Sequence, residues 1–371
     1  MDKFIPVNEP SIGEREKELL NECLDTGWIS SEGPFVEKFE ISLSKRVNRK
    51  YGIACSSGTA ALDLAIASLK IGNGDEVIMP AFTIISCASA IIKSGAKPIL
   101  IDSDPKTWNM NTDAIEDAIT TKTVAIMAVH IYGLPVDMDP IIKIANKYGL
   151  YIIEDAAELI GAKYKDKECG SFGHVSTFSF YSNKQITTGE GGMVLTNDLE
   201  ISNRCKSLRN LCFQSEKRFV HEELGWNYRM TNLQAALGIA QLEKLDSTIK
   251  KKINIGKLYT ENLKHIKNIQ LPLNRTDFAK NIYWVFGILI DSKFGSAKKV
   301  MEILKTQKIG TRPFFYPMHK QPIFKKMGIF QNNHLPISEH LYRQGLYLPS
   351  GIDLTEENIN TICEKFKKIY K

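Results

Sequence analysis

The 371-residue sequence contains no run of about 18 apolar residues, the length that a membrane-spanning helix requires. Its N-terminal stretch, MDKFIPVNEPSIGEREKELL, carries charges and prolines and has no apolar core of the kind found in secretion signals. The sequence also lacks internal repeats and low-complexity segments. These absences argue against secretion and membrane insertion, and they predict a cytoplasmic protein.

Cysteines are few and widely spaced. No Cys-x-x-Cys pair and no paired histidine spacing accompanies the seven of them. We therefore expect free thiols in a reducing compartment, and neither a structural zinc site nor another metal site.

Charge is nearly balanced, with 48 basic and 42 acidic residues and a formal net charge of +6. No arginine-rich run with interleaved aromatics is present, so we expect no nucleic-acid partner. A mild positive field suits an anionic small molecule. The length favours two domains over a single small core.

Short apolar runs alternate with helical patterns through the first part of the chain. The predicted strands are 51–55, 74–80, 98–104, 123–133 and 150–155, and the predicted helices between them include 83–95, 112–119 and 137–148. This alternation is typical of an α/β fold built from right-handed βαβ units with a mostly parallel sheet. We expect a large α/β domain at 1–245, including an extended N-terminal arm.

The remaining sequence predicts a smaller C-terminal α+β domain at 246–371. A lysine-rich helix at 246–270 leads into it, followed by strands at 282–290 and 311–315 and helices at 297–307 and 355–370. The segment YPMHKQPIFKKMG (316–328) has the composition of a loop.

A turn of small residues, Ser57, Gly58 and Thr59, joins strand 51–55 to a predicted helix. Such a turn offers free backbone N–H groups, hydroxyls and the positive end of a helix dipole, which suit a phosphate. It lacks the lysine and the glycine spacing of a P-loop. An ordinary helix N-cap accounts for the same residues.

Lys184 lies between a predicted strand at 177–180 and a glycine-rich turn that leads to a second strand at 193–196. Most lysines are solvated surface groups, but an amine desolvated at the lip of a sheet becomes a nucleophile for carbonyl groups. Asp155 follows another predicted strand, where a carboxylate either caps the next helix or binds a ligand. Because ligands collect at the carboxyl ends of parallel strands, both residues can share one rim. The glycines of the turn would let backbone approach a ligand closely.

Six motifs, in this order, resemble those of the DegT-type sugar-nucleotide aminotransferases: CSSGTAAL (55–62), IIEDAAE (152–158), STFSFYSNK (176–184), TTGEGGM (187–193), GWNYRMTN (225–232) and RPFFYPMH (312–319). The resemblance runs from about residue 5 to the C-terminus. It implies the pyridoxal 5′-phosphate (PLP)-dependent transferase type I fold, with PLP and its amino form PMP as cofactor, and a homodimer with shared active sites.

The resemblance also implies a role for each matching residue. Lys184 would form the Schiff base and transfer the proton, and Asp155 would pair with the pyridine nitrogen. Ala157 would pack beneath the ring, and Glu158 would lie near its phenolic oxygen. The residues expected to bind phosphate are Ser57, Gly58, Thr59 and Ser179, with Asn227 reaching the phosphate of the partner subunit's cofactor.

The motifs at 28–33 (WISSEG) and 312–319 are most similar to the branch that aminates carbon 4 of GDP-4-keto-6-deoxymannose. L-glutamate would be the amino donor, and the product would serve O-antigen or other surface glycan synthesis. The residues expected at the nucleotide sugar are Trp28, Ser30, Arg229, Arg312, Tyr316 and His319. An isolated tryptophan such as Trp28 also suits a core position.

Three features depart from the family pattern: Ile84 replaces a common aromatic, Ser182 replaces a glycine, and the loop 211–218 lacks its usual glycine-bearing sequence. They leave open the nucleotide base (GDP, UDP or dTDP), the sugar stereochemistry and amination at carbon 3 or carbon 4. Two other functions compete. A PLP-dependent sugar 3-dehydratase carries histidine in place of Lys184, and a catalytically silent nucleotide-sugar-binding protein need not keep Lys184 and Asp155.

Overall fold

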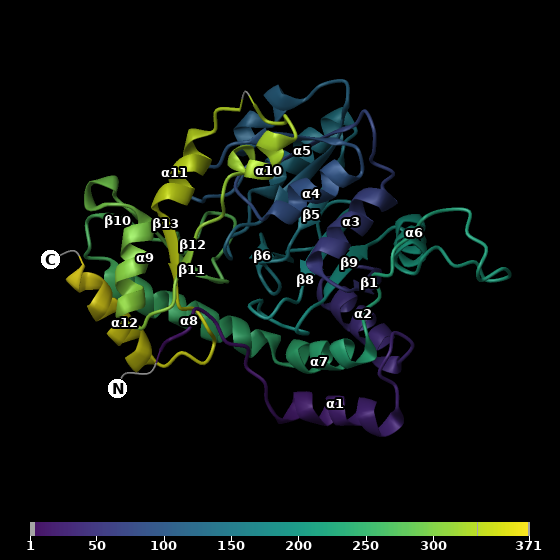
Figure 1. The fold of residues 1–371 in the computed structure, drawn as a ribbon, viewed down its shortest axis with the longest axis horizontal. Coiled ribbons are helices and arrows are strands. Elements are labelled where there is room, and N and C mark those ends of the chain that lie inside the picture. Colours follow the sequence, from purple (N-terminus) through teal and green to yellow (C-terminus); the bar gives the residue numbers. More distant parts are fainter. Residues whose placement is uncertain (1–3, 332, 370–371) are drawn as a thin grey trace.

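The computed structural model describes residues 4–331 and 333–369 (Figure 1). A large sheet with helices on both sides forms one part, and a smaller sheet with its own helices forms the other, close to both chain ends (Figure 1). Within these described ranges, no helix combines the length and apolar character that crossing a membrane demands.

The elements of the larger part are α1 (Glu14–Thr26), α2 (Pro34–Arg46), β1 (Tyr51–Cys55), α3 (Gly58–Ser68), β2 (Glu76–Pro80), α4 (Ile85–Lys93), β3 (Lys97–Ile101), the 3₁₀ turns η1 (Thr112–Ala114) and η2 (Glu116–Ala118), β4 (Thr123–Val129), α5 (Met138–Tyr148), β5 (Tyr151–Asp155), β6 (Lys163–Tyr164), β7 (Lys167–Glu168), β8 (Val175–Ser179), β9 (Gly192–Thr196), α6 (Leu199–Arg209) and α7 (Asn232–Glu243). The elements of the smaller part are α8 (Leu245–Leu263), β10 (Ile269–Gln270), β11 (Phe286–Ile290), η3 (Ser292–Phe294), α9 (Ala297–Thr306), β12 (Arg312–Pro313), η4 (Met318–Lys320), α10 (Pro322–Lys326), α11 (Pro336–Gln344), β13 (Gly345–Leu348) and α12 (Glu356–Lys368).

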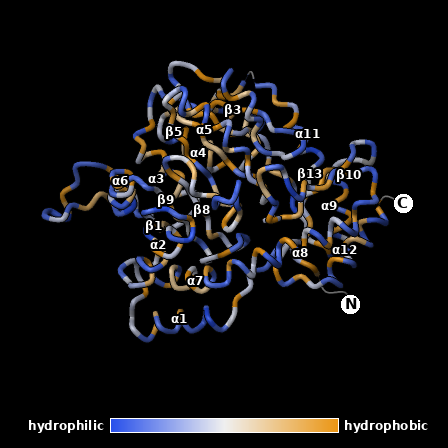
Figure 2. Tube along the Cα trace, turned by 180° about the vertical axis from the view of Figure 1, so that it is seen from behind, coloured by the Kyte–Doolittle hydropathy of each residue, from blue (hydrophilic) through white to orange (hydrophobic). Residues whose placement is uncertain are grey.

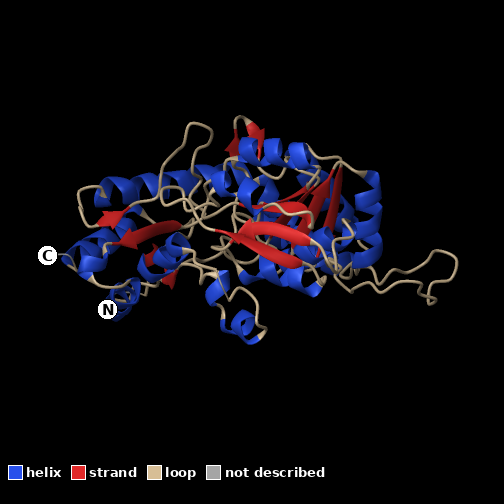
Figure 3. Cartoon of the chain, turned by 90° about the horizontal axis from the view of Figure 1, so that it is seen from above, coloured by secondary structure: helices blue, strands red, loops and turns tan. Residues whose placement is uncertain are grey.

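The large sheet has seven strands in the order β1-β9-β8-β5-β4-β2-β3. Figure 3 shows strands in red with helices in blue around them. The run from β8 through β5, β4 and β2 to β3 is parallel, which confirms the mostly parallel prediction. Only β9 runs against its neighbours β8 and β1 within this sheet. Because β9 is antiparallel to both β1 and β8, β1 runs parallel to β8. The carboxyl ends of β1 and β8 therefore lie at the same edge of the sheet.

Side chains of the central strands alternate between two buried faces. On β4, Ala125 and Met127 pack into one core with α3, α4 and α6, whereas Ile126 and Ala128 pack into another with α2, α5 and α7. A strand covered on both faces must be apolar throughout, which is why its sequence lacks a polar alternation. The large sheet is therefore a rigid platform that presents its residues at the strand ends.

The smaller sheet is antiparallel, in the order β10-β11-β13-β12. Helices α8, α9 and α12 bury its apolar face in a third core around Phe286, Leu346 and Phe366. Helix α8, which begins at Leu245, leads from the larger part into this one. The predicted arm 1–10, of which 4–10 are described, also lies on this part: Ile5 pairs with Ile309, and Ser350 N donates to Val7 O (2.8 Å).

Four local predictions were wrong. The helix predicted at 246–270 ends at Leu263, and Ile269–Gln270 form β10. The segment 316–328 is not a simple loop, because it contains η4 and α10, the latter with Pro322 at its start, where proline is favoured. Residues 112–119 form the two 3₁₀ turns η1 and η2 instead of one helix. Strand 311–315 shortens to β12, which pairs with β13, a strand the sequence did not predict.

Candidate active site

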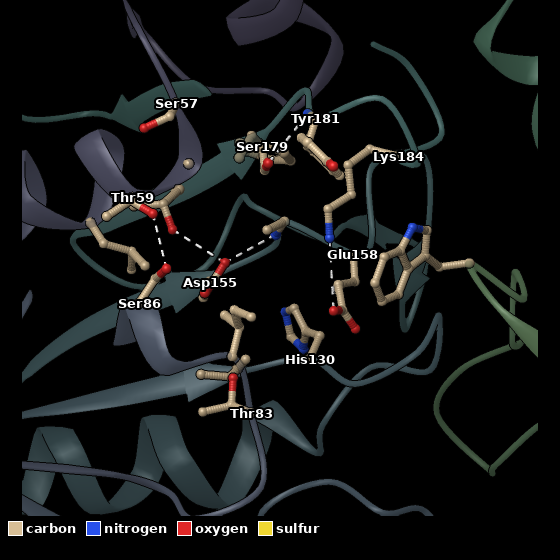
Figure 4. Close-up of a pocket in the computed structure, with 18 of the residues that line it drawn as sticks. Ser57, Thr59, Thr83, Ser86, His130, Asp155, Glu158, Ser179, Tyr181 and Lys184 are labelled. Carbon is tan, nitrogen blue, oxygen red and sulfur yellow. Dashed lines mark hydrogen bonds and ion pairs between the residues drawn. The ribbon is translucent and has the colours of Figure 1, made fainter. Parts of the chain in front are cut away.

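A cavity of about 350 Å³ opens at the edge of the large sheet where the strands end (Figure 4). Asp155 closes β5, Ser179 closes β8, and Ser57 follows β1. Because these strands run in the same direction, their ends converge, as expected for an open α/β sheet. The cavity brings together eight of the predicted site residues: Ser57, Gly58, Thr59, Asp155, Ala157, Glu158, Ser179 and Lys184.

The turn at the start of α3 lines one side of the cavity. Ser57 caps the helix by accepting a hydrogen bond from Ala60 N (3.1 Å), and Thr59 Oγ1 lies 2.9 Å from Ser86 Oγ. The first turn contains no acidic residue, so the positive end of the helix dipole is uncompensated. A Cβ on Gly58 would lie 2.7 Å from Ser179 Cβ, so only glycine fits there. The turn is thus both an N-cap and a site suited to an anion.

The glycine-rich turn after Lys184 serves packing of the chain on itself. A Cβ on Gly192 would lie 2.3 Å from the carbonyl oxygen of Ser57, and one on Gly191 would lie 2.2 Å from Thr188 Oγ1. The sequence leads us to expect that these glycines let backbone approach a ligand. At Gly192 the close approach is instead between β9 and the Ser57 turn.

The amine of Lys184 lies between a carboxylate and an aromatic face. Its Nζ is 3.8 Å from Glu158 Oε1 and 3.7 Å from the centre of the Trp284 ring, and the side chain is 11% exposed. The Trp284 indole also donates to Asn183 O (2.8 Å), which holds the turn that carries the lysine. Burial lowers the pKa of Lys184, while the Glu158 and Asp155 charges oppose that shift. A lowered pKa leaves more of the amine unprotonated, which is the form that attacks carbonyl groups.

Glu158 is fully desolvated beside Lys184. Its Oε2 accepts a hydrogen bond from Tyr132 N (2.7 Å). Burial raises the pKa of Glu158 to about 7, against the lowering effect of the Lys184 charge. The Glu158 carboxyl therefore changes its protonation near neutral pH, beside the Lys184 amine.

Asp155 is 3% exposed, and its carboxylate borders the cavity (Figure 4). Oδ1 accepts from Ala157 N (3.1 Å) and Thr177 Oγ1 (3.4 Å), and Oδ2 accepts from Cys87 Sγ (3.2 Å). Among the described residues, no basic side chain forms an ion pair with it, since Lys184 pairs with Glu158. A buried carboxylate without an ion pair suits a cationic group placed in the cavity.

Three aromatic residues that the sequence did not single out form the opposite wall: Trp284, Phe315 and Tyr347. The Tyr132 ring packs against all three of them. Tyr132 OH accepts a hydrogen bond from Phe315 N (3.1 Å), which ties the large sheet to the smaller part. Burial and the Glu158 charge raise the pKa of Tyr132 well above its usual value, so its phenol stays neutral. Trp284 lies in the apolar run IYWVFGILI, where the sequence offers no signal that separates it from core residues.

His130, Glu154 and Cys169 lie close enough together to be considered as metal ligands. His130 Nε2 is 3.0 Å from Glu154 Oε1, and His130 Nδ1 accepts from Val136 N (3.2 Å). Glu154 also accepts from two backbone N–H groups, those of Gly170 and Phe172. The histidine and glutamate atoms that could bind a metal already form hydrogen bonds within the protein, so we assign no metal to this cluster.

The residues expected at the nucleotide sugar do not line this cavity in the single chain. Trp28 is 50% exposed, which excludes the core position, and Ser30 beside it is also exposed. Arg312 is exposed, and its side chain donates to its neighbour Thr311 O (3.3 Å). Tyr316 is half-buried against Tyr342.

Asn227 and Arg229 lie on the segment between α6 and α7, outside the cavity of their own chain. Asn227 is exposed, and Arg229 donates to Asn210 Oδ1 (2.7 Å). His319 is 3% exposed, and its Nε2 lies 3.1 Å from Glu339 Oε1. Burial lowers the pKa of His319. The His319 ring is thus held against Glu339 of α11.

A sequence profile of the DegT/DnrJ/EryC1/StrS aminotransferase family matches residues 10–367. The chain is 43% identical to GDP-perosamine synthase of Escherichia coli O157:H7 over 368 residues, 99% of each chain. It is 38% identical to GDP-perosamine synthase of Vibrio cholerae over 369 residues, again 99% of each. The fold resembles that of Spr1654 from Streptococcus pneumoniae in its PLP form, with a TM-score of 0.92 at 25% identity over 99% of this chain and 98% of that one.

Proposed function

This chain belongs to the DegT/DnrJ/EryC1/StrS aminotransferase family and is a PLP-dependent sugar aminotransferase, and we propose that it converts GDP-4-keto-6-deoxymannose to GDP-perosamine with L-glutamate as amino donor. The observation that carries the choice of substrate is the 43% identity with a GDP-perosamine synthase along 99% of both chains. The chemistry is supported by the meeting of Lys184, Asp155 and the Ser57 turn in one cavity.

The residues around the cavity fit PLP group by group. The uncompensated start of α3, with Ser57, Gly58 and Thr59, suits its phosphate. Asp155, a buried carboxylate without an ion pair, suits its protonated ring nitrogen. The amine of Lys184, whose pKa is lowered by burial, suits its aldehyde carbon. When bound, PLP supplies an electron sink for the carbon that loses a proton.

The chain's own residues would orient the reactants and move the proton. Lys184 Nζ would take the proton from the donor's carbon and return it during amination of the sugar, because no other amine borders the cavity among the described residues. Glu158 would set how readily Nζ releases that proton, since the two groups are 3.8 Å apart and shift each other's pKa. Trp284 would exclude water from one side of the amine.

The second copy of the chain would complete each site. The segment between α6 and α7 projects from the molecule (Figure 1), and it carries apolar side chains in the open, with Phe219 79% and Leu224 90% exposed. Figure 2 shows hydrophobic stretches along the same projection. Exposed apolar side chains on a projecting segment are typical of a surface that a partner covers. We place Asn227 at the phosphate of the partner subunit's cofactor, and Trp28, Ser30, Arg229 and Arg312 around the nucleotide sugar.

The substrate is tested by incubating PLP-loaded protein and L-glutamate with GDP-, UDP- and dTDP-linked 4-keto-6-deoxy sugars side by side. We expect turnover of the GDP-linked sugar to exceed the others by about 100-fold, since a pocket built to hydrogen-bond one base leaves its polar groups unpaired with another. Mass spectrometry separates an amino product from the deoxygenated product of a 3-dehydratase, and NMR locates the new amine. Amination of only the UDP or dTDP sugar, or at carbon 3, would refute the proposed substrate.

The shared site is tested by mixing two inactive variants, Lys184→Ala and Asn227→Asp. The second places a negative charge where a phosphate is expected, which should repel it. If Asn227 acts across the interface, each mixed dimer has one intact site, and random exchange of subunits restores roughly a quarter of wild-type activity. If Asn227 acts in its own subunit, or if the sites are not shared, the mixture stays as inactive as its components.

A further inference from the structure

Cys87, near the start of α4, donates a hydrogen bond from its thiol to Asp155, the proposed partner of the ring nitrogen. Its side chain is fully buried, and Sγ lies 3.2 Å from Asp155 Oδ2. On the other side, Sγ lies 3.5 Å from Thr83 Oγ1. All seven cysteines are free and buried. Among the described hydrogen bonds, only that of the Cys87 thiol joins a cysteine to an acidic residue of the cavity.

The two oxygens of Asp155 are held differently. Oδ1 accepts from Ala157 N and Thr177 Oγ1, whereas the described residues give Oδ2 a single donor, the Cys87 thiol. Two donors on Oδ1 alone would leave the carboxylate plane free to rock about the Cβ–Cγ bond. The contact at Oδ2 restrains that rotation.

The thiol remains a donor throughout the working pH range. Burial and the neighbouring Asp155 charge raise the pKa of Cys87 well above its usual value. A thiol is nevertheless a weaker donor than a hydroxyl. It therefore orients a carboxylate while drawing less on its negative charge, which remains available to a cation in the cavity.

We propose that Cys87 is a positioning residue, whose thiol fixes the orientation of the Asp155 carboxylate toward the ring nitrogen of PLP. This rests on the proposed function, in which Asp155 pairs with that nitrogen. Cys87 itself touches neither cofactor nor substrate, so its effect must pass through Asp155.

The experiment compares binding of two ligands to the apoenzyme: PLP and its analogue with a C–H group in place of the ring nitrogen. We expect Cys87→Ala to raise the dissociation constant of PLP about fivefold, because one hydrogen bond to a charged group is lost, and to change that of the analogue less than about twofold. Cys87→Ser, which keeps a donor, should recover most of the PLP affinity. An equal rise in both dissociation constants would show that Cys87 has a merely structural role. An unchanged dissociation constant for PLP would show that Cys87 has no such role.

Cys205 supplies a matched control. It is also fully buried, but its thiol contacts Leu64 O (3.8 Å) and not the cavity. Cys205→Ala should leave both dissociation constants unchanged. A wild-type apoenzyme that binds neither ligand would refute the proposed function itself, an outcome distinct from a failure of the Cys87 variants.

Infrared spectroscopy of the apoenzyme gives a second readout without any ligand. The difference between wild type and Cys87→Ala isolates the S–H stretching band of Cys87. We expect that band to move to higher frequency in Asp155→Asn, because an amide is a weaker acceptor than a carboxylate. A band that does not move would show that the thiol does not donate to Asp155.

Discussion

Lys184 and Lys252 are both buried, and burial is the largest cause lowering the pKa of each amine, that of Lys252 to about 7. Their surroundings differ. Lys184 borders a cavity of about 350 Å³ between Glu158 and the Trp284 ring, whereas Lys252 donates to the Ser350 carbonyl where α8 meets the smaller sheet. A cavity beside Lys252, which Lys184 also borders, measures about 10 Å³, room for one water molecule. A lowered pKa therefore does not by itself mark a catalytic lysine: space for a reacting carbonyl and neighbouring charges must accompany it.

The largest expected difference between the two lysines is in turnover. Lys184→Ala should lower kcat by about 1,000-fold or more, because it removes the group that we propose as both nucleophile and proton carrier. Lys252→Met, which keeps the length of the side chain, should keep kcat within about threefold. Steady-state rates with L-glutamate and the GDP-linked sugar measure both. Comparable losses in the two variants would remove the distinction between a reactive and a structural buried lysine.

A second difference concerns the charges around each amine. At pH 8, Glu158 is mostly ionised, given its pKa of about 7, and its charge holds the proton on Lys184. Glu158→Gln removes that charge, so the pKa of Lys184 should fall further and its reductive methylation in the apoenzyme should accelerate roughly threefold to tenfold.

Lys252 is the internal control for this labelling. Burial is the single cause of its pKa shift, with no acidic neighbour contributing, so Glu158→Gln should leave its labelling rate unchanged. Peptide mass spectrometry follows both sites in one sample. Slower labelling of Lys184 in the variant would mean that Glu158 does not hold the proton there.

The same two lysines show what the sequence could predict. The sequence predicts a role for Lys184 because Asp155 and the Ser57–Thr59 turn are expected at the same strand-end rim, and because all of them fall within the family motifs. Asp155 was predicted for the corresponding reason, at the end of an apolar strand. These predictions depend on short stretches of sequence, and the fold class follows from their alternation.

What the sequence missed depends on contacts between distant segments. Trp284 reaches Lys184 from a segment 100 residues further along the chain, and Tyr132 is positioned by hydrogen bonds to Glu158 and Phe315. No local pattern encodes such contacts. Lys252 did carry a signal: it shares the buried face of α8 with Ile249, Gly256 and Tyr259, at helical spacing. Its position on that face separates it from its exposed neighbour Lys251.

The smallest expected effect is on stability, and it tests whether Lys252 is buried in its neutral form. Its pKa is about 7 in the folded chain against a usual value of 10.5. Between these pH values the unfolded chain binds more protons, so the free energy of unfolding should rise with pH, with this residue contributing up to about 1.4 kcal/mol per pH unit. Below pH 7 the residue is protonated in both states, and the full cost of burying its charge remains.

Lys252→Met should therefore flatten the dependence of unfolding free energy on pH between about pH 7.5 and 9.5, measured by urea denaturation. The Ser350 carbonyl loses its donor in this variant, but that loss offsets the curve equally at every pH and leaves its slope unaffected. Lys251→Met is the matched control, because the Lys251 side chain is 58% exposed and should keep the wild-type slope. If Lys252→Met also keeps that slope, Lys252 is protonated in the folded chain. The difference between Lys252 and Lys184 would then lie in their contacts and not in the effect of burial.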